Sequence, residues 1–306
     1  MVKLYSNFDI EKKHKGSIIL IGNFDGLHLG HQKLFKLAQS YKKKYNLKIG
    51  VINFNPMPKM FFNKNLKNFR LSNINQKIKL LSNLKVDFII TKKFDYKFSR
   101  IKSINFIKEI LNKKINSKFI FVSNNFRFGN KREGNVNLLI KNEKTYNYKV
   151  VKPKPLINNK KIVSSSLIRN LLENGFLEKA NKLLNRNWAI QGVVKKGRQV
   201  GKKIGFPTCN IDIQDYVLAK PGVYAVKVLR KNNSKYLKGI ANLGYRPTFN
   251  QKKILLEVHL FNFSGNLYNK LLSVEFLKFI RKEKKFKNVN QLKTQIKTDL
   301  NIAKKT

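Results

Sequence analysis

The segment from Gly22 to His31 holds glycines and histidines at spacings that suit the binding of phosphate. Gly22, Gly26 and Gly30 recur at every fourth position, so backbone amides can approach a ligand closely there. An apolar run precedes the segment and a helical pattern follows it, and the start of a helix attracts an anion. His28 and His31 are one helical turn apart and can both donate hydrogen bonds to charge that develops on phosphate. The alternative, that both are hydrogen-bonded polar residues of the core, leaves their coincidence with the glycines unexplained.

A second glycine-rich stretch precedes two neutral oxygen donors in the second half of the chain. Its glycines, at 192, 197, 201 and 205, do not have the Gly-x-x-x-x-Gly-Lys-Ser/Thr spacing, which excludes a P-loop kinase. We expect a backbone cradle, followed by Thr208 and Asn210, whose side-chain oxygens can join ATP phosphates around Mg²⁺. The alternative for Thr208 and Asn210 is the ordinary polar alternation of a strand.

Glu257 is one of only 16 acidic residues and lies in a segment with the alternation of a strand. Apolar residues at 256, 258 and 260 fall on one face of that strand, whereas Glu257 and His259 fall on the other. The carboxylate is either a reactive group of a site or a solvated strand residue. We interpret His259 as structural.

The elements that must position the histidines alternate between short apolar runs and helical patterns. Leu34, Leu37 and Ala38 recur at the spacing of a helix that begins after the histidines. The apolar runs typical of buried strands lie at 18–21, 49–54, 86–90 and 119–122. This alternation predicts an α/β domain with a Rossmann-like parallel sheet.

The second half of the chain predicts a different architecture. Serines at 164–166 and Gly175 mark the two ends of a short helix, and a further helical stretch covers 176–184. After residue 186, strands follow one another without helices, at 188–194, 223–229, 236–243, 254–263 and 271–280. We therefore expect domains at 1–186 and 187–306, the second an antiparallel sheet or barrel closed by a helix over 288–303.

Composition limits the class of protein. The chain has 306 residues, which suits two domains, and a formal net charge of +49. Its 55 lysines are spread along the whole chain, so we interpret the charge as a solvated surface that attracts small anions, with no nucleic-acid partner. One cysteine, the absence of a long apolar run and the absence of a secretory signal predict a cytoplasmic protein with no membrane partner. We expect a monomer or a weak homo-oligomer.

Only 10 arginines occur in this lysine-rich chain, so a retained arginine suggests a site that needs the planar set of hydrogen-bond donors of its guanidinium group.

The histidine segment resembles the motif of the nucleotidylyltransferase superfamily. Asn124–Gly129 with Arg132, and Ser164–Arg169, resemble later motifs of the bacterial bifunctional riboflavin kinase / FAD synthetase (FMN adenylyltransferase) family. The kinase signature of that family is similar to Gly192–Asn210, Pro221–Tyr224, Gly244–Phe249, Leu256–Leu260 and Arg281–Phe286. The motifs cover nearly the whole chain in the expected order.

The resemblance implies two ATP-dependent reactions. The barrel would phosphorylate riboflavin to FMN with MgATP, and the α/β domain would adenylylate FMN to FAD with release of pyrophosphate. Glu257 would accept the proton of the ribityl hydroxyl, and His28 and His31 would stabilise charge on the ATP phosphates. Thr208 and Asn210 would bind Mg²⁺. The residues expected to bind nucleotide or phosphate are Gly22, Phe24, Asp25, Gly26, Gly30, Asn125, Arg127, Ser165, Ser166, Arg169, Gly197, Gly201, Lys202, Gly205 and Pro207, and those expected to contact the flavin are Arg281 and Phe286.

Met57 and Lys202 are two of the residues that depart from the family pattern. Met57 stands where the family has a histidine, and methionine cannot donate a hydrogen bond. Loss of one positioned donor costs about 10² to 10³ in rate. The alternative hypothesis is therefore a riboflavin kinase whose adenylyltransferase domain is weakened or inactive. Lys202 stands at a usual arginine position, where a point charge replaces a bidentate contact.

Overall fold

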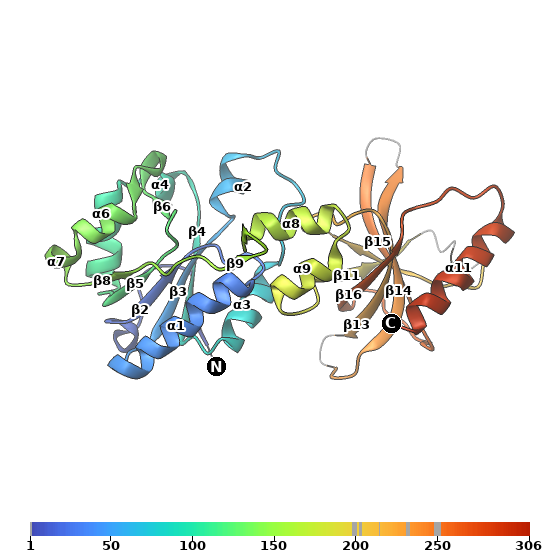
Figure 1. Cartoon of the computed structure of the whole chain (residues 1–306), viewed down its shortest axis with the longest axis horizontal. Coiled ribbons are helices and arrows are strands. Elements are labelled where there is room, and N and C mark those ends of the chain that lie inside the picture. Colours follow the sequence, from blue (N-terminus) through green and yellow to red (C-terminus); the bar gives the residue numbers. More distant parts are fainter. Residues whose placement is uncertain (1, 198–200, 202–203, 214, 231–232, 248–251) are drawn as a thin grey trace. The chain divides into compact units, whose positions relative to one another are not determined.

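The structure is a computed structural model that describes residues 2–197, 201, 204–213, 215–230, 233–247 and 252–306 (Figure 1). It divides into two compact units, the first comprising residues 1–67 and 74–164, the second residues 68–73 and 165–306. The short segment 68–73 thus belongs with the C-terminal part of the chain. The compact units divide the chain earlier, at residue 164. The boundary at residue 186 between functional domains stays a prediction.

The first unit is built on a six-stranded sheet in which every strand pair is parallel (Figure 1). Five of the strands have the Rossmann order, in which successive strands are added first on one side of β2 and then on the other. The predicted Rossmann-like sheet is confirmed, although the edge strands β1 and β8 were not predicted. The order across the sheet is β1 (Lys3–Tyr5), β4 (Phe88–Lys93), β3 (Ile49–Asn55), β2 (Ile18–Ile21), β5 (Phe119–Phe121) and β8 (Lys149–Val151).

Helices cover both faces of this sheet. Ile18 of β2 packs with Phe35 of α1 (Leu29–Tyr45) on one face. The next residue, Ile19, points to the opposite face, where the π-helix η2 (Phe106–Lys114) packs. The remaining elements of the first unit are short: η1 (Lys12–His14), α2 (Pro58–Phe62), α3 (Ile74–Asn83), α4 (Tyr96–Ser99), α5 (Ser103–Asn105), β6 (Arg127–Phe128), η3 (Asn130–Arg132), β7 (Gly134–Asn135), α6 (Val136–Lys141), α7 (Glu143–Tyr146), β9 (Ile157–Asn158) and β10 (Lys161–Ile162).

The second unit contains a closed, six-stranded antiparallel barrel, which confirms the predicted barrel. The order around it is β11 (Ala189–Lys195), β12 (Cys209–Asp212), β15 (Lys252–Leu260), β14 (Leu237–Pro247), β13 (Gly222–Arg230) and β16 (Leu271–Arg281), and β16 pairs again with β11. Of these strands, only β12 was not predicted. The helices α8 (Ser165–Glu173), α9 (Leu177–Leu184) and α11 (Val289–Lys304) accompany the barrel.

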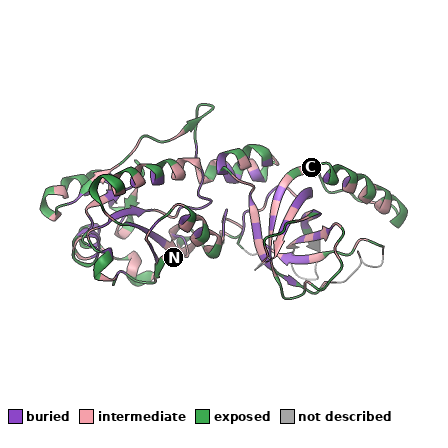
Figure 2. Cartoon of the chain, turned by 90° about the horizontal axis from the view of Figure 1, so that it is seen from below, coloured by how far each residue is buried: buried purple, intermediate pink, exposed green. Residues whose placement is uncertain are grey.

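The barrel strands separate an aromatic interior from an outer face that α11 covers. Trp188, Tyr224 and Phe276 are fully buried and pack on one another. Val223, which precedes Tyr224 and so points the other way, packs in a second cluster with Ala303 of α11. Figure 2 shows buried residues concentrated in the strands, whereas exposed residues are numerous on α11. Outer-face side chains such as Val223 are therefore buried by α11.

A buried ion pair joins α11 to the barrel. Arg281, at the end of β16, donates from Nε and NH2 to the Asp299 carboxylate of α11 at 2.7 to 3.0 Å. Gln295 donates a further hydrogen bond of 2.9 Å to Asp299 Oδ1. Asp299 is only 2 % exposed, so its charge depends on these donors. The pair fixes the position of the helix that covers the outer face.

We predict that Asp299→Ala lowers the free energy of unfolding of the barrel unit by about 3 to 5 kcal/mol, because Arg281 is left with a largely buried, unpaired charge. Trp188 is the only tryptophan and lies in the barrel, so its fluorescence during urea unfolding reports on this unit. Lys195→Ala, which removes an exposed pair with Asp212, serves as the control and should change stability by less than about 1 kcal/mol. Equal losses in the two variants would contradict a special role for the buried pair.

Candidate active sites

The predicted histidine segment forms the turn between β2 and α1. His28 is the N-cap of α1, and its Nδ1 accepts a hydrogen bond of 3.4 Å from the backbone N–H of His31. The proton of a neutral His28 is therefore assigned to Nε2, which can donate to a ligand. The two imidazole rings stack with their centroids 3.7 Å apart. Both rings thus lie at the carboxyl end of β2, where the strand order of the sheet reverses and where open α/β sheets bind ligands.

The imidazole of His31 is enclosed by the protein, but one of its ring nitrogens lacks a hydrogen-bond partner among the described residues. The ring of Phe24 packs edge-on against it, with centroids 5.2 Å apart. The buried Nδ1 of His31 has no hydrogen-bond partner among the described residues. Burial lowers the pKa of His31 well below its usual value, and the nearby His28 and Lys77 lower it further. His31 is therefore a neutral imidazole at pH 7, and its open nitrogen suits a polar ligand.

The glycines of the segment allow this close packing. A Cβ on Gly30 would lie 3.1 Å from His28 Nδ1 and 3.1 Å from a backbone carbonyl oxygen. Gly26 has φ +76°, in the left-handed region that glycine adopts without strain. Gly22 lies against the ring of Phe24, and Asp25 is buried in the same turn. The contact of these residues with phosphate stays a prediction.

Other predicted residues of the first unit follow the neighbouring strand β5. Asn125 accepts a hydrogen bond of 2.9 Å from the hydroxyl of Ser123, and Arg127 is exposed in β6. Because β2 and β5 are adjacent and parallel, these residues follow the same edge of the sheet as the histidines. Met57, in contrast, is a buried residue at the start of α2.

Three predicted nucleotide-binding residues lie in α8, which belongs to the second unit. Arg169 donates from Nε to the carbonyl oxygen of Phe69 at 2.7 Å, and its guanidinium lies 3.7 Å from the centroid of the Phe69 ring. The arginine is therefore engaged with the segment 68–73, a contact that the sequence did not reveal. The role of Ser165, Ser166 and Arg169 in nucleotide binding stays a prediction.

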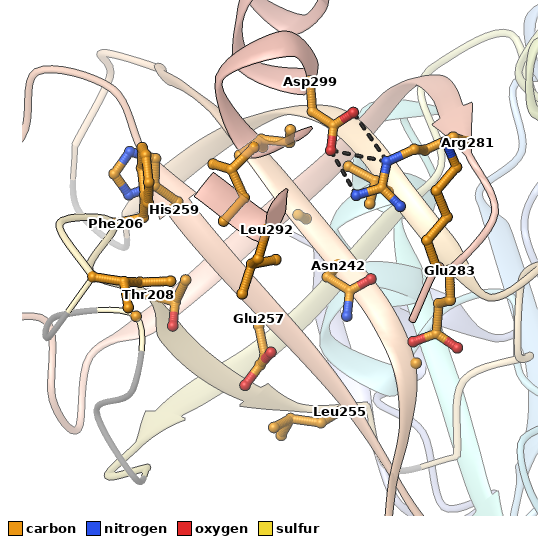
Figure 3. A pocket seen from close by; sticks show the side chains of 18 of the residues that line it. Phe206, Thr208, Asn242, Leu255, Glu257, His259, Arg281, Glu283, Leu292 and Asp299 are labelled. Carbon is orange, nitrogen blue, oxygen red and sulfur yellow. Dashed lines mark hydrogen bonds and ion pairs between the residues drawn. The ribbon is translucent and has the colours of Figure 1, made fainter. Parts of the chain in front are cut away.

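A cavity of about 490 Å³ lies on the outer face of the barrel, beside α11 (Figure 3). Residues directly opposite one another on paired strands point to the same side of the sheet. The pairings place five cavity residues in one row across neighbouring strands: Asn210, Glu257, Asn242, Val223 and Arg281. Glu257 is thus flanked by Asn210 on one side and by Asn242 on the other, and Asn242 was not identified from the sequence.

One end of this row has the chemistry of a cation and phosphate site. The Oδ1 atom of Asn210 is buried and has no hydrogen-bond partner among the described residues. Thr208 lines the cavity beside it. A Cβ on Gly197 would lie 1.7 Å from Asn210 Nδ2, and one on Gly201 would lie 3.3 Å from Thr208 Oγ1, so the glycine-rich stretch packs on both residues. Lys202 lies outside the described residues.

These neutral oxygens fit Mg²⁺ in a phosphate complex. Within the described part of the chain, no group of three His, Cys, Asp or Glu residues could hold a metal ion. In this cavity, a divalent cation would be held by oxygens such as those of Thr208 and Asn210 and by the phosphates themselves.

The loop before β12 is held by His259. The Nδ1 atom of His259 is 2.8 Å from the carbonyl oxygen of Pro207, and Phe206 packs edge-on against the imidazole. This contact agrees with the interpretation of His259 as structural. Gly205, at φ +90°, supplies the turn that precedes this contact.

The other end of the cavity combines apolar side chains with charged ones such as Arg281 and Glu283. Phe286 lines it together with Leu292 and Ile296 of α11. Arg281 also lines the cavity, but its guanidinium pairs with Asp299 and lies 5.9 Å from the ring of Phe286. Direct contact of Arg281 or Phe286 with a flavin stays a prediction, whereas the bond of Arg281 to α11 gives it a positioning role.

Comparison with known proteins identifies both units. The family model described as FAD synthetase matches residues 10–167, and the family model described as riboflavin kinase matches residues 184–306. The matches do not support the alternative hypothesis of an inactive adenylyltransferase domain.

Curated relatives cover nearly the whole chain. The bifunctional riboflavin kinase/FMN adenylyltransferase of Buchnera aphidicola subsp. Schizaphis graminum is 42 % identical over 97 % of this chain and 96 % of its own. The protein of the same name from Escherichia coli strain K12 is 36 % identical over 93 % of this chain and 91 % of its own.

A solved structure shares the fold. The crystal structure of a protein from Streptococcus pneumoniae, described as a macrolide-efflux protein, covers 99 % of this chain and 98 % of its own, with a TM-score of 0.87 and 26 % sequence identity. Among the described residues of our chain, no helix combines the length and the apolar character needed to cross a membrane. With two family models in tandem and relatives aligned over nearly their full length, the chain belongs to the bifunctional riboflavin kinase/FMN adenylyltransferase family.

Proposed function

We propose that this chain catalyses two successive reactions of flavin cofactor synthesis. The barrel unit transfers the γ-phosphoryl group of one ATP to riboflavin, which yields FMN and ADP. The α/β unit transfers AMP from a second ATP to FMN, which yields FAD and pyrophosphate. The observation that carries this proposal is the succession of an FAD synthetase match and a riboflavin kinase match in one chain.

The row of polar side chains supports the kinase reaction. Glu257 is the member of the row that can accept a proton, and it lies opposite Asn210 and its unsatisfied oxygen. In this proposal, the Glu257 carboxylate takes the proton of the terminal ribityl hydroxyl as that oxygen attacks the γ-phosphorus. When bound, Mg²⁺ would neutralise charge on the phosphates, with Thr208 and Asn210 among its ligands. The end of the cavity that Phe286 lines would hold the flavin ring.

The histidine turn supports the adenylyl transfer. The imidazoles of His28, the N-cap of α1, and His31, in its first turn, are stacked, and burial keeps His31 neutral. Neutral imidazoles can donate hydrogen bonds to phosphate oxygens without losing a proton at the pH of the reaction. The helix N-terminus adds positive potential at the same place. These groups would stabilise the charge that moves onto the leaving pyrophosphate.

We predict that Glu257→Gln lowers the rate of riboflavin phosphorylation about 10² to 10⁴-fold, because an amide cannot accept the hydroxyl proton. The measurement is FMN formation from riboflavin and MgATP, with separation of the flavins by chromatography. FAD formation from supplied FMN should be unchanged. Glu178→Gln, on the exposed surface of α9, is the matched control. Full kinase activity in the Glu257 variant would exclude this carboxylate as the base.

We predict that His31→Leu lowers FAD formation from FMN and ATP about 10² to 10³-fold, since a positioned donor is lost at the phosphates. Riboflavin phosphorylation in the same sample should keep its rate, because the barrel unit is unchanged, and an unaltered far-UV circular dichroism spectrum checks that the α/β unit is folded. Loss of both activities together would indicate a general folding defect instead of a local role.

The lowered pKa of His31 predicts the pH dependence of the same step. A histidine whose pKa is depressed in the folded protein remains neutral as the pH falls through 6.5, the usual value. Between pH 8 and 6.5, FAD formation should therefore show no change that reflects protonation of His31. A change in rate over this interval that disappears in His31→Leu would contradict a neutral imidazole.

A further inference from the structure

Asn242 is a polar residue of the barrel cavity whose side chain has no assigned role. It lies on β14, lines the cavity and is partly exposed to it. Its side-chain amide makes no hydrogen bond within the described part of the chain. A polar group with open donors and an open acceptor in a ligand cavity points to a ligand that supplies the missing partners.

The strand register fixes the position of Asn242 relative to the reacting groups. Asn242 is directly opposite Glu257 on β15, and Glu257 is directly opposite Asn210 on β12. Neighbouring strands are about 4.8 Å apart, so the three side chains follow one another at this interval. Figure 3 shows Asn242 between Glu257 on one side and Arg281 with Glu283 on the other.

The two ends of the row differ in chemistry, and Asn242 lies between them. Beyond Glu257 are the neutral oxygens of Asn210 and Thr208, which suit a cation and phosphates. On the other side of Asn242 lie Arg281 and Glu283, and the ring of Phe286 is 5.9 Å from the Arg281 guanidinium. A substrate with a flat aromatic end and a hydroxyl that reacts at Glu257 must therefore pass its connecting chain across Asn242.

We propose that Asn242 binds the hydroxyl-bearing chain of riboflavin and directs its terminal hydroxyl to Glu257. The inference rests on the proposed kinase activity of the barrel unit. A carboxamide can donate to one hydroxyl oxygen and accept from another hydroxyl, which matches a polyol. Because the amide is uncharged, Asn242 itself places no charge beside the Glu257 carboxylate. Asn242 is thus a substrate-binding and positioning residue, whereas Glu257 is the base.

Two flavins separate this role from a structural one. Riboflavin carries the polyol chain, and lumiflavin has the same ring system with only a methyl group in its place. The dissociation constants of both are measured by quenching of flavin fluorescence, with the full-length chain and MgADP present. In Asn242→Leu, which has a similar size but no polar atoms, riboflavin should bind about tenfold more weakly, and lumiflavin should bind as to the unaltered chain. Asn301→Leu, exposed on α11 and outside the cavity, should change neither constant.

Each outcome decides the proposal. Equal weakening of riboflavin and lumiflavin would assign Asn242 a structural role, and no weakening of either would remove it from the site. Unchanged binding of lumiflavin checks that the barrel unit of the variant is folded. If the unaltered chain forms no FMN from riboflavin and MgATP, the proposed kinase function fails independently of this result.

Discussion

The register of the barrel strands is the constraint on which the kinase site depends. In a closed sheet, the register in which two strands pair decides which of their residues face the interior of the barrel and which face outward. A shift of β15 by one residue would turn Glu257 into the aromatic interior and bring Leu256 to the cavity. The burial of Trp188, Tyr224 and Phe276 opposes such a shift, because the interior packs around these rings. Packing of the aromatic interior thus keeps the Glu257 carboxylate on the outer face of the barrel.

The outer face would be an open surface without α11. The helix supplies Leu292 and Ile296 as one wall of the cavity, and Arg281 ties it to the barrel through Asp299. The cost of an unpaired buried charge makes this attachment specific to one position of the helix. The stability of the barrel and the shape of the cavity therefore depend on the same ion pair.

The α/β unit uses a different constraint, which is the order of its parallel strands. The chain passes from β3 and β4 on one side of β2 to β5 and β8 on the other. The turn after β2 is consequently not covered by a crossover connection, and the first turn of α1 lies open to a ligand there. The glycines allow His28 and His31 to stack within this turn, and burial keeps His31 neutral. The strand order thus provides the place of the two imidazoles, and burial provides the neutral state of His31.

Sequence alone determined the two fold classes, most strands and those candidate site residues whose amino-acid type is rare in this chain. His28 and His31 were found because histidine is rare in this chain, and Glu257 because acidic residues are scarce. Lys77, in contrast, is buried near His31 but cannot be distinguished by sequence among 55 lysines.

Only the tertiary structure decided which residues become neighbours across large sequence separations. Asn242 lies beside Glu257 through strand pairing, and Arg281 is committed to Asp299 through helix packing. Arg169 meets Phe69, which is 100 residues away in the chain. Local sequence records the periodicity and type of side chains, but contacts of this kind arise from closure of the barrel and from packing between distant segments, which no local pattern encodes.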